Sequence, residues 1–420
     1  MRLLLSPMGS YGDMLPYLAI AKEAVARGHE VVVYGFPKFQ EWAQSTGARY
    51  VPLSSDEVYD SVVREVQKTN PLQSLKVALE RQVEGVGPFV EAMRADVVPG
   101  DTLALGGLFM PAHRVLAEIT DTLDVTLHLA AASIGSFAQP PRYATQLDLG
   151  RKLIRSRRVN RLIWRGADRM FFKRHFTHPL NQIRSSYGLA PIRGGVMAWH
   201  NQAHMMLGLF PEWFSHAPDW PAQLVQTSFV LNDEQGGKSL PAEVEEFLAA
   251  GPAPVVFTAG TPNMKARPFF AESVEACRRT GLRGILMCQY PELVPANLPE
   301  NVITVRYAPY SVLMSRAAVF VHHGGIGTMA QALRAGVPQL IRPVGYDQFD
   351  NSESAVRLGV ARELLPRFYH AEALAEELRE MVDDAALRAR CAEVAALVRT
   401  ECATSATRSV ELLEAANAAR

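Results

Sequence analysis

Short apolar runs that alternate with helical patterns constrain the fold of this 420-residue chain more than any other feature. The run EVVVY at 30–34 is almost continuously apolar, as expected for a strand that a parallel sheet buries on both faces. The residues before it, 15–27, have an amphipathic helical pattern that Gly28 ends as a C-terminal cap. This alternation predicts a parallel sheet covered by helices on both faces.

The alternation continues through both halves of the chain, so two domains are expected. In the first half, further strands are predicted at 3–6, 48–53, 102–105 and 125–129. In the second half, the predicted strands are APVVFTAG (253–260), RGILMC (283–288), NVITVRY (301–307), AAVFVHH (317–323) and GVPQLIRP (336–343). A helical region at 72–97 is expected to break near Gly85–Pro88, because glycine and proline weaken a helix interior.

A segment rich in Asp, Glu, Gly and Pro, at 232–254, separates the two halves and is typical of a linker with a short helix. We therefore expect two Rossmann-like doubly wound domains, an N-terminal one at 1–230 and a C-terminal one at 231–400. Residues 401–420 are predicted to form a C-terminal helix that can pack back on the N-terminal domain.

The composition argues against several classes of protein. Lys and Arg total 43, as do Asp and Glu, so no excess charge favours a nucleic-acid partner. The four cysteines form no CxxC pair, which argues against a zinc site or a disulfide framework. No apolar stretch approaches the roughly 20 residues of a membrane span, and the N-terminus lacks signal-peptide character. We expect a cytoplasmic protein.

One basic segment, RKLIRSRRVNRLIWRGADRMFFKR at 151–174, departs from this even charge balance. The simpler interpretation, which we favour, is a solvated helix face whose apolar stripe packs on the core. The alternative is that this segment recognises an acceptor substrate or makes a peripheral contact with the inner face of the cytoplasmic membrane.

A β-like run, a glycine turn and a helical pattern follow one another at 317–336. Such a turn presents free backbone N–H groups at the positive end of a helix, where phosphate binds. Glycines let the backbone approach the phosphate, and His323 and Thr328 can add donors. The alternative is an ordinary turn whose buried histidines bond to the backbone.

The pattern HHGGIGT…ALRAGVPQ…P…DQFDN resembles the donor-binding signature of the family 1 glycosyltransferases, which have the GT-B fold, two Rossmann-like domains that face a central cleft. In that family the His-Gly-Gly turn holds the pyrophosphate of a nucleotide sugar, and the Asp-Gln pair bonds the sugar hydroxyls. The resemblance implies a donor-binding set of Thr258, Thr261, Tyr307, Ala308, His323, Gly324, Gly325, Ile326, Gly327, Thr328, Gln331, Asp347 and Gln348.

Two positions in this set bear on the nucleotide. Tyr307 in YAPY stands where the family has a Trp that stacks on the base, and Tyr310 replaces the family's Gln. Members that use UDP-sugars usually carry Glu at the position of Gln331, where it accepts hydrogen bonds from both ribose hydroxyls. A neutral Gln is a weaker acceptor and a deoxyribose needs less, so a dTDP-sugar is favoured over a UDP-sugar.

The stretch GDMLP at 12–16 lies between the first strand and the first helix, where an open α/β sheet binds ligands. The family commonly has Gly-His-x-x-Pro here, with the His as general base. Asp13 resembles the Gly-Asp variant of some bacterial members, so it is the candidate catalytic base. The alternative is that Asp13 caps the helix expected from Leu15. We expect transfer with inversion, because there is one candidate base and no second nucleophile. We expect it to be independent of a metal, because there is no Asp-x-Asp motif.

Within the family, GSYGD, VVFTAGT and DQFDN are most similar to the rhamnolipid rhamnosyltransferases and related bacterial glycosyltransferases. This similarity implies dTDP-L-rhamnose as donor, no further cofactor, and a small hydrophobic or lipid acceptor such as a hydroxy fatty acid. The alternative is a polyketide or flavonoid glycosyltransferase that uses another dTDP- or UDP-hexose.

Two other classes of protein are alternatives to a glycosyltransferase. A sugar-nucleotide epimerase can have the same fold, but Asp347, Gln348 and the Gly-Asp loop argue against it. A non-catalytic accessory subunit is expected to have lost donor residues, and here they are intact.

Overall fold

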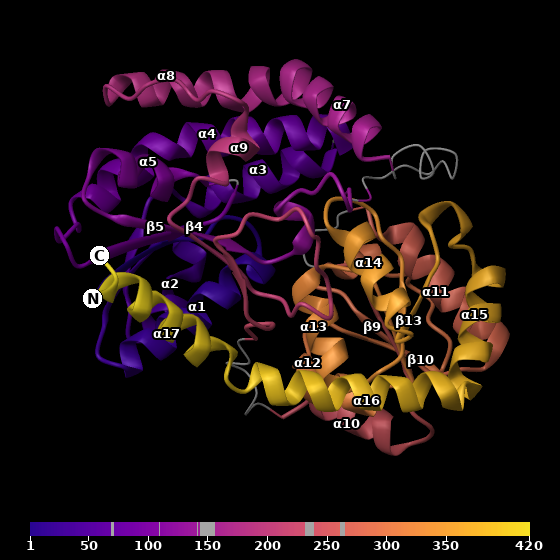
Figure 1. Cartoon of the computed structure of the whole chain (residues 1–420). Coiled ribbons are helices and arrows are strands. Elements are labelled where there is room, and N and C mark those ends of the chain that lie inside the picture. Colours follow the sequence, from indigo (N-terminus) through magenta and orange to yellow (C-terminus); the bar gives the residue numbers. More distant parts are fainter. Residues whose placement is uncertain (69–70, 109, 141, 143–155, 232–238, 261–264) are drawn as a thin grey trace. The chain divides into compact units, whose positions relative to one another are not determined.

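The computed structural model describes residues 1–420 except 69–70, 109, 141, 143–155, 232–238 and 261–264 (Figure 1). The chain divides into two compact units, and each is described by itself. Unit 1 consists of Met1–Pro141, Thr145–Val230 and Ala403–Arg420, and unit 2 consists of Arg142–Ala144 and Leu231–Cys402.

Unit 1 is built on a seven-stranded sheet in the order β3-β2-β1-β4-β5-β6-β7. Each of its strand pairs is parallel. The strands are β1 (Arg2–Ser6), β2 (Glu30–Gly35), β3 (Arg49–Pro52), β4 (Thr102–Gly106), β5 (Leu123–His128), β6 (Met205–Gly208) and β7 (Leu224–Gln226). The order reverses between β1 and β4, and ligands of doubly wound sheets bind at the carboxyl ends of the strands at such a switch point.

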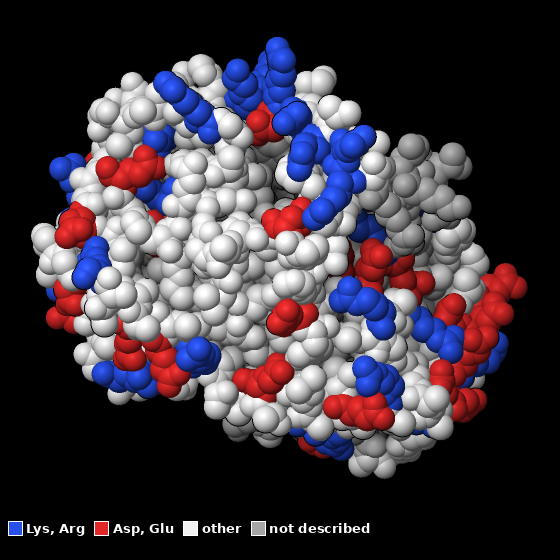
Figure 2. All heavy atoms as spheres, viewed as in Figure 1, with Lys and Arg blue, Asp and Glu red and all other residues white. Residues whose placement is uncertain are grey.

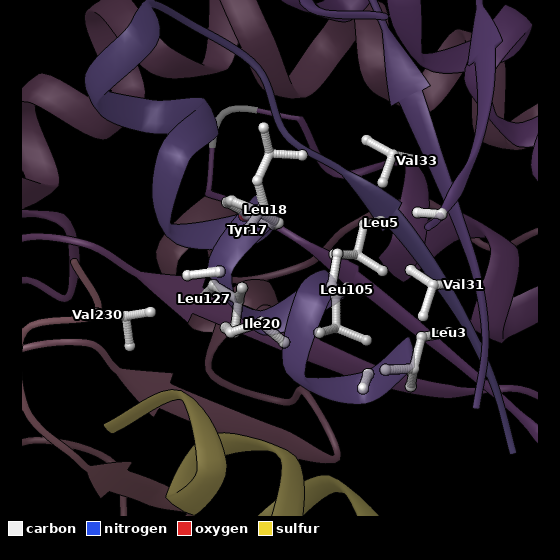
Figure 3. Packing of buried hydrophobic residues seen from close by; sticks show 14 of the residues in the cluster. Leu3, Leu5, Tyr17, Leu18, Ile20, Val31, Val33, Leu105, Leu127 and Val230 are labelled. Atoms are coloured by element: carbon white, nitrogen blue, oxygen red, sulfur yellow. The ribbon is translucent and has the colours of Figure 1, made fainter. Parts of the chain in front are cut away.

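Successive side chains of β1 build a core on each face of this sheet, because a strand points alternate residues to opposite sides. Leu3 and Leu5 pack with α1 (Tyr11–Ala26) and α17 (Ser405–Ala418) on one face (Figure 3). Leu4 packs with α4 (Pro71–Arg94) on the other face. Both faces are therefore covered, as the apolar strand runs predicted.

The remaining helical elements of unit 1 are η1 (Pro37–Phe39), α2 (Gln40–Ser45), α3 (Asp56–Lys68), α5 (Ala112–Ile119), η2 (Ala131–Ser133), α7 (Arg157–Ala167), the π-helical η3 (Asp168–Thr177), α8 (His178–Ser186) and α9 (Val196–His200). The break predicted near Gly85–Pro88 was wrong. Helix α4 runs unbroken through that segment, because buried Val83, Val86 and Val90 anchor both sides of it in the core. Helix α1 begins earlier than the predicted start at Leu15, because Ser10 caps it.

Unit 2 is a second parallel sheet, in the order β10-β9-β8-β11-β12-β13. Its strands are β8 (Val255–Thr258), β9 (Gly284–Met287), β10 (Val302–Val305), β11 (Val319–His322), β12 (Gln339–Ile341) and β13 (Ala361–Glu363). Its helical elements are α10 (Ala242–Ala249), α11 (Arg267–Thr280), η4 (Pro291–Leu293), α12 (Tyr310–Leu313), η5 (Met314–Arg316), α13 (Ile326–Ala335), α14 (Gln348–Arg357), η6 (Pro366–Phe368), α15 (Ala371–Asp383) and α16 (Ala385–Cys402). The switch point of this sheet lies between β8 and β11.

The predicted fold class is confirmed: each unit is a Rossmann-like, doubly wound parallel sheet. Every strand named from the sequence is present, whereas β6, β7 and β13 were not predicted. The short helix expected in the linker is α10, and the C-terminal helix α17 clusters with unit 1. Across the described ranges, no helix is both long and apolar enough to cross a bilayer.

Candidate active site

The glycine turn joins β11 to α13 at the switch point of unit 2. Gly324 has a φ of +89°, and a Cβ on it would lie 2.9 Å from Ile341 Cγ2. A Cβ on Gly325 would lie 2.6 Å from His323 Nε2, so both positions favour glycine. The backbone bonds of α13 begin with Met329 N donating to Gly325 O, which leaves the N–H groups of residues 326–328 at the helix N-terminus.

The first of the two adjacent histidines, His322, supports the turn. Its Nδ1 accepts a hydrogen bond from Gly324 N at 3.1 Å, and its Nε2 lies 3.0 Å from Gln339 Oε1. The proton must therefore be on Nε2, because Nδ1 accepts. The side chain is fully buried, and burial lowers the pKa of His322 to about 3. His322 is thus a neutral residue that holds the turn in place.

His323 has a different environment, since its buried Nδ1 has no hydrogen-bond partner among the residues that the structure describes. The ring lies beside Gly260, where a Cβ would come within 2.8 Å of His323 Cε1. Burial lowers the pKa of His323 to about 4, so the imidazole is neutral near pH 7. A neutral ring can donate one hydrogen bond from whichever nitrogen carries the proton.

Tyr310 links the end of β8 to the first turn of α13. Its hydroxyl is hydrogen-bonded to the side chains of Thr258 and Thr328. Both threonines belong to the predicted donor set, whereas no role was predicted for Tyr310, because its contacts come from segments about 18 and 52 residues away in the chain. The predicted Ile326 and Gly327 lie in the same turn of α13, and the predicted Thr261 lies outside the described residues.

The residues expected near the nucleoside differ in exposure. Tyr307 is 47% exposed, as an aromatic ring available for stacking must be, whereas Ala308 is buried. Gln331 lies on α13, and its Oε1 accepts a hydrogen bond from Arg334 Nη2 at 2.8 Å. One lone pair of this acceptor is already engaged within the helix.

The Asp347–Gln348 pair begins helix α14, with Asp347 as its N-cap residue. Gln348 Oε1 accepts hydrogen bonds from the backbone N of Val344 at 2.9 Å and of Gly345 at 3.2 Å, so its amide nitrogen can donate to a sugar hydroxyl. The same turn contains Tyr346 with a φ of +53°, a left-handed backbone that is costly for an aromatic residue and typical of functional sites.

Asn351, one turn further along α14, ties this pair to the glycine turn. Its Nδ2 donates to Gly324 O at 3.0 Å and to Asp347 Oδ2 at 2.6 Å. These two hydrogen bonds fix the glycine turn and the start of α14, with Asp347 and Gln348, relative to each other within unit 2.

Asp13 lies at the switch point of unit 1, in the first turn of α1. Its Oδ2 accepts hydrogen bonds from Ser10 N at 2.7 Å and from Ser10 Oγ at 3.0 Å. The N-cap residue is therefore Ser10, and Asp13 is the N3 residue of the helix, which completes a capping box with Ser10. Gly9 makes room for this carboxylate, since a Cβ on Gly9 would overlap Asp13 Oδ2 and lie 2.6 Å from Asp13 Cγ.

The second oxygen of this carboxylate, Oδ1, accepts no hydrogen bond from another of the described residues. Burial raises the pKa of Asp13, and the hydrogen bonds from Ser10 partly oppose that rise. A carboxylate with a raised pKa is a stronger base than a solvated one, so Asp13 combines a fixed orientation with an available oxygen.

Comparison with known proteins adds independent findings. Residues 288–411 match the model of the erythromycin biosynthesis protein CIII-like C-terminal domain. The chain is 29% identical to O-mycaminosyltylonolide 6-deoxyallosyltransferase of Streptomyces fradiae, over 96% of this chain and 94% of that protein. It is also 29% identical to glycosyltransferase GtfC of Amycolatopsis orientalis, over 97% of this chain and 96% of that protein.

Solved structures share the fold over nearly the whole chain. The glycosyltransferase of kitacinnamycin superposes with a TM-score of 0.72 at 22% identity, covering 99% of this chain and 98% of that one. Spinosyn rhamnosyltransferase SpnG complexed with thymidine diphosphate superposes with a TM-score of 0.65 at 17% identity, covering 98% and 100%. Together with the motifs and the two parallel sheets, these similarities show that the chain is a glycosyltransferase with the GT-B fold.

Proposed function

We propose that the chain transfers L-rhamnose from dTDP-L-rhamnose, with inversion, to a hydroxyl group of a small hydrophobic or lipid acceptor such as a hydroxy fatty acid. The observation that carries the donor part of this proposal is the double hydrogen bond of Asn351. It fixes the glycine turn, suited to a pyrophosphate, relative to Asp347, suited to sugar hydroxyls.

The pyrophosphate is proposed to bind at the N-terminus of α13. The N–H groups of residues 326–328 and the positive end of the helix dipole favour an anion there. His323 adds a neutral donor, and Thr258 and Thr328 add hydroxyls that Tyr310 orients. These groups would also stabilise the charge that develops on the leaving nucleotide.

The nucleoside is proposed to stack on Tyr307, with the backbone of Ala308 at the edge of the base. The hydrogen bond that Gln331 accepts from Arg334 supports a deoxyribose, because it leaves the amide oxygen less able to accept from two ribose hydroxyls. The thymidine diphosphate complex of the spinosyn rhamnosyltransferase supports the same nucleotide for this chain.

Asp13 is proposed to act as the general base. It would accept the proton of the acceptor hydroxyl as that oxygen attacks the anomeric carbon, and the bond to the nucleotide would break on the opposite face. Its raised pKa and the available Oδ1 support this role. The acceptor itself is proposed to contact the segments 72–97 and 133–176, of which 141 and 143–155 lie outside the described residues.

Transfer of another dTDP- or UDP-hexose to a natural product such as a polyketide or flavonoid is the second candidate. The names of two relatives favour it, O-mycaminosyltylonolide 6-deoxyallosyltransferase and the vancomycin aglycone glucosyltransferase of Amycolatopsis orientalis. The similarity to rhamnolipid rhamnosyltransferases stays a prediction from the sequence motifs. The two candidates share the donor site and differ in the acceptor.

A lipid acceptor agrees with the outer surface of α7 and η3, where basic side chains concentrate (Figure 2). Leu162, Ile163 and Met170 are 65%, 50% and 79% exposed among these cations. Exposed apolar side chains between basic ones suit an anionic lipid surface. We include a peripheral membrane contact through this surface in the proposal.

The experiment is a calorimetric comparison of dTDP with UDP, followed by mass spectrometry of products from dTDP-L-rhamnose with hydroxy fatty acid, macrolide and flavonoid acceptors. The proposal expects tighter binding of dTDP and a rhamnosylated fatty acid. Tighter binding of UDP contradicts the donor assignment, and a product formed only with the macrolide or flavonoid selects the second candidate.

A further inference from the structure

Arg142 belongs to the first half of the sequence but clusters with unit 2. Its Nη1 donates to Glu363 Oε2 at 2.6 Å, and its Nη2 donates to Glu363 Oε1 at 2.7 Å. The two side chains are only 14% and 16% exposed. A bidentate pair of this kind fixes both distance and orientation.

The same arginine contacts helix α14 directly and through its partner. Its guanidinium lies 5.7 Å from the ring centroid of Phe349. Its backbone N donates to Asp350 Oδ1 at 2.8 Å. Glu363 also accepts a hydrogen bond from Ser352 Oγ at 2.7 Å, which ties β13 to α14. Arg142 and Glu363 therefore contact three residues in the first two turns of this helix, Phe349, Asp350 and Ser352.

Asp350 is a buried carboxyl group of α14 that accepts a hydrogen bond from the backbone of Arg142. Its Oδ2 is buried without a partner among the described residues, and burial raises the pKa of Asp350 to about 7. Asp347 and Glu353 raise it further, while Arg142 opposes them through its backbone hydrogen bond and its charge. Arg142 therefore supports a carboxyl group that the helix would otherwise bury unpaired.

Other contacts of α14 belong to the candidate donor site, where Asn351 bonds to Gly324 O and Asp347. In the first two turns of this helix, Arg142 contacts Phe349 and Asp350, whereas the glycine turn is bound by Asn351. A shift of the helix would move Asp347 and Gln348 relative to the turn.

We propose that Arg142 is a positioning residue for the donor sugar, acting through Glu363 and α14 on Asp347 and Gln348. This inference rests on the proposed function. It assigns to a residue from the first half of the sequence a share in sugar recognition. Because the Asp347–Gln348 pair is assigned to the sugar and not to the nucleotide, loss of Arg142 should weaken binding of the nucleotide sugar and leave binding of the nucleotide unchanged.

The test compares calorimetric affinities for dTDP and dTDP-L-rhamnose in the wild-type protein and in Arg142→Met. The variant should keep the dTDP affinity and lose about tenfold in dTDP-L-rhamnose affinity, as expected for a weakened pair of hydrogen bonds. Glu363→Gln should cause a similar loss, and the double variant should lose no more than the larger single loss. Arg278→Met, which removes an exposed ion pair with Glu275 in the same unit, is the control.

The outcomes separate this inference from the proposed function. A wild-type protein that binds dTDP-L-rhamnose no more tightly than dTDP contradicts the proposed sugar site, and the inference fails with it. A wild-type preference for the sugar nucleotide that Arg142→Met leaves unchanged overturns the inference alone. Equal losses for both ligands show a general structural effect and also overturn it.

Discussion

Replacing Gly9 with alanine is expected to slow sugar transfer by displacing the Asp13 carboxylate. Gly9 has a φ of +134°, and its added Cβ would overlap Asp13 Oδ2 and lie 2.6 Å from Asp13 Cγ. Relieving this overlap requires a shift of about 1 Å, and a misplacement of that size in a catalytic group costs on the order of 100-fold in rate. The proposed nucleotide site is built from residues of unit 2, so the dTDP affinity should not change.

The assay is kcat for transfer, with dTDP affinity from calorimetry. Gly28→Ala is the control, because Gly28 also has a positive φ, +85°, but its Cβ would meet open space. Both variants are expected to lose about 1–3 kcal/mol of stability from backbone strain. A Gly9→Ala variant whose kcat equals that of Gly28→Ala would refute the reasoning about Asp13.

Three further predictions concern other parts of the molecule. Tyr310→Phe removes the hydroxyl that holds two threonines, and should weaken dTDP binding by about 1 kcal/mol in calorimetry. Gly325→Ala forces a Cβ to within 2.6 Å of His323 Nε2, and should weaken dTDP binding more than Tyr310→Phe does. Burial lowers the pKa of His113 to about 4 and of His128 to about 3, from 6.5. Between pH 6.5 and 4 these two histidines are therefore protonated in the unfolded chain and neutral in the folded one. The free energy of unfolding in urea titrations should then decrease as the pH falls from 6.5 towards 4.

The central strands and the glycine turn could be predicted from the sequence because their signals are local. Each of these buried strands is a continuous apolar run, and Gly336 ends α13 with a φ of +78°, a left-handed backbone that favours glycine directly after a helix. The helix interior at Gly85–Pro88 was predicted wrongly, because local propensity favours a break and only the tertiary core shows that it does not occur.

The contacts that support the site could not be predicted, because they join distant segments. Tyr310 bonds to residues on two different elements, and Arg142 reaches Glu363 across 221 positions in the chain. A single sequence contains no periodic pattern that pairs such residues. The capping box at Ser10 could have been predicted locally, since Asp13 is the N3 residue of the helix that Ser10 caps.

Asp13→Asn tests the central claim most directly, because asparagine has nearly the same shape and can still accept the hydrogen bonds from Ser10. The measurement is the rate of transfer from dTDP-L-rhamnose, together with dTDP affinity and thermal stability. If Asp13 is the base, the rate should fall by about 100- to 10,000-fold while affinity and stability stay at wild-type values. A variant that transfers sugar at the wild-type rate would contradict this role and leave Asp13 with capping alone.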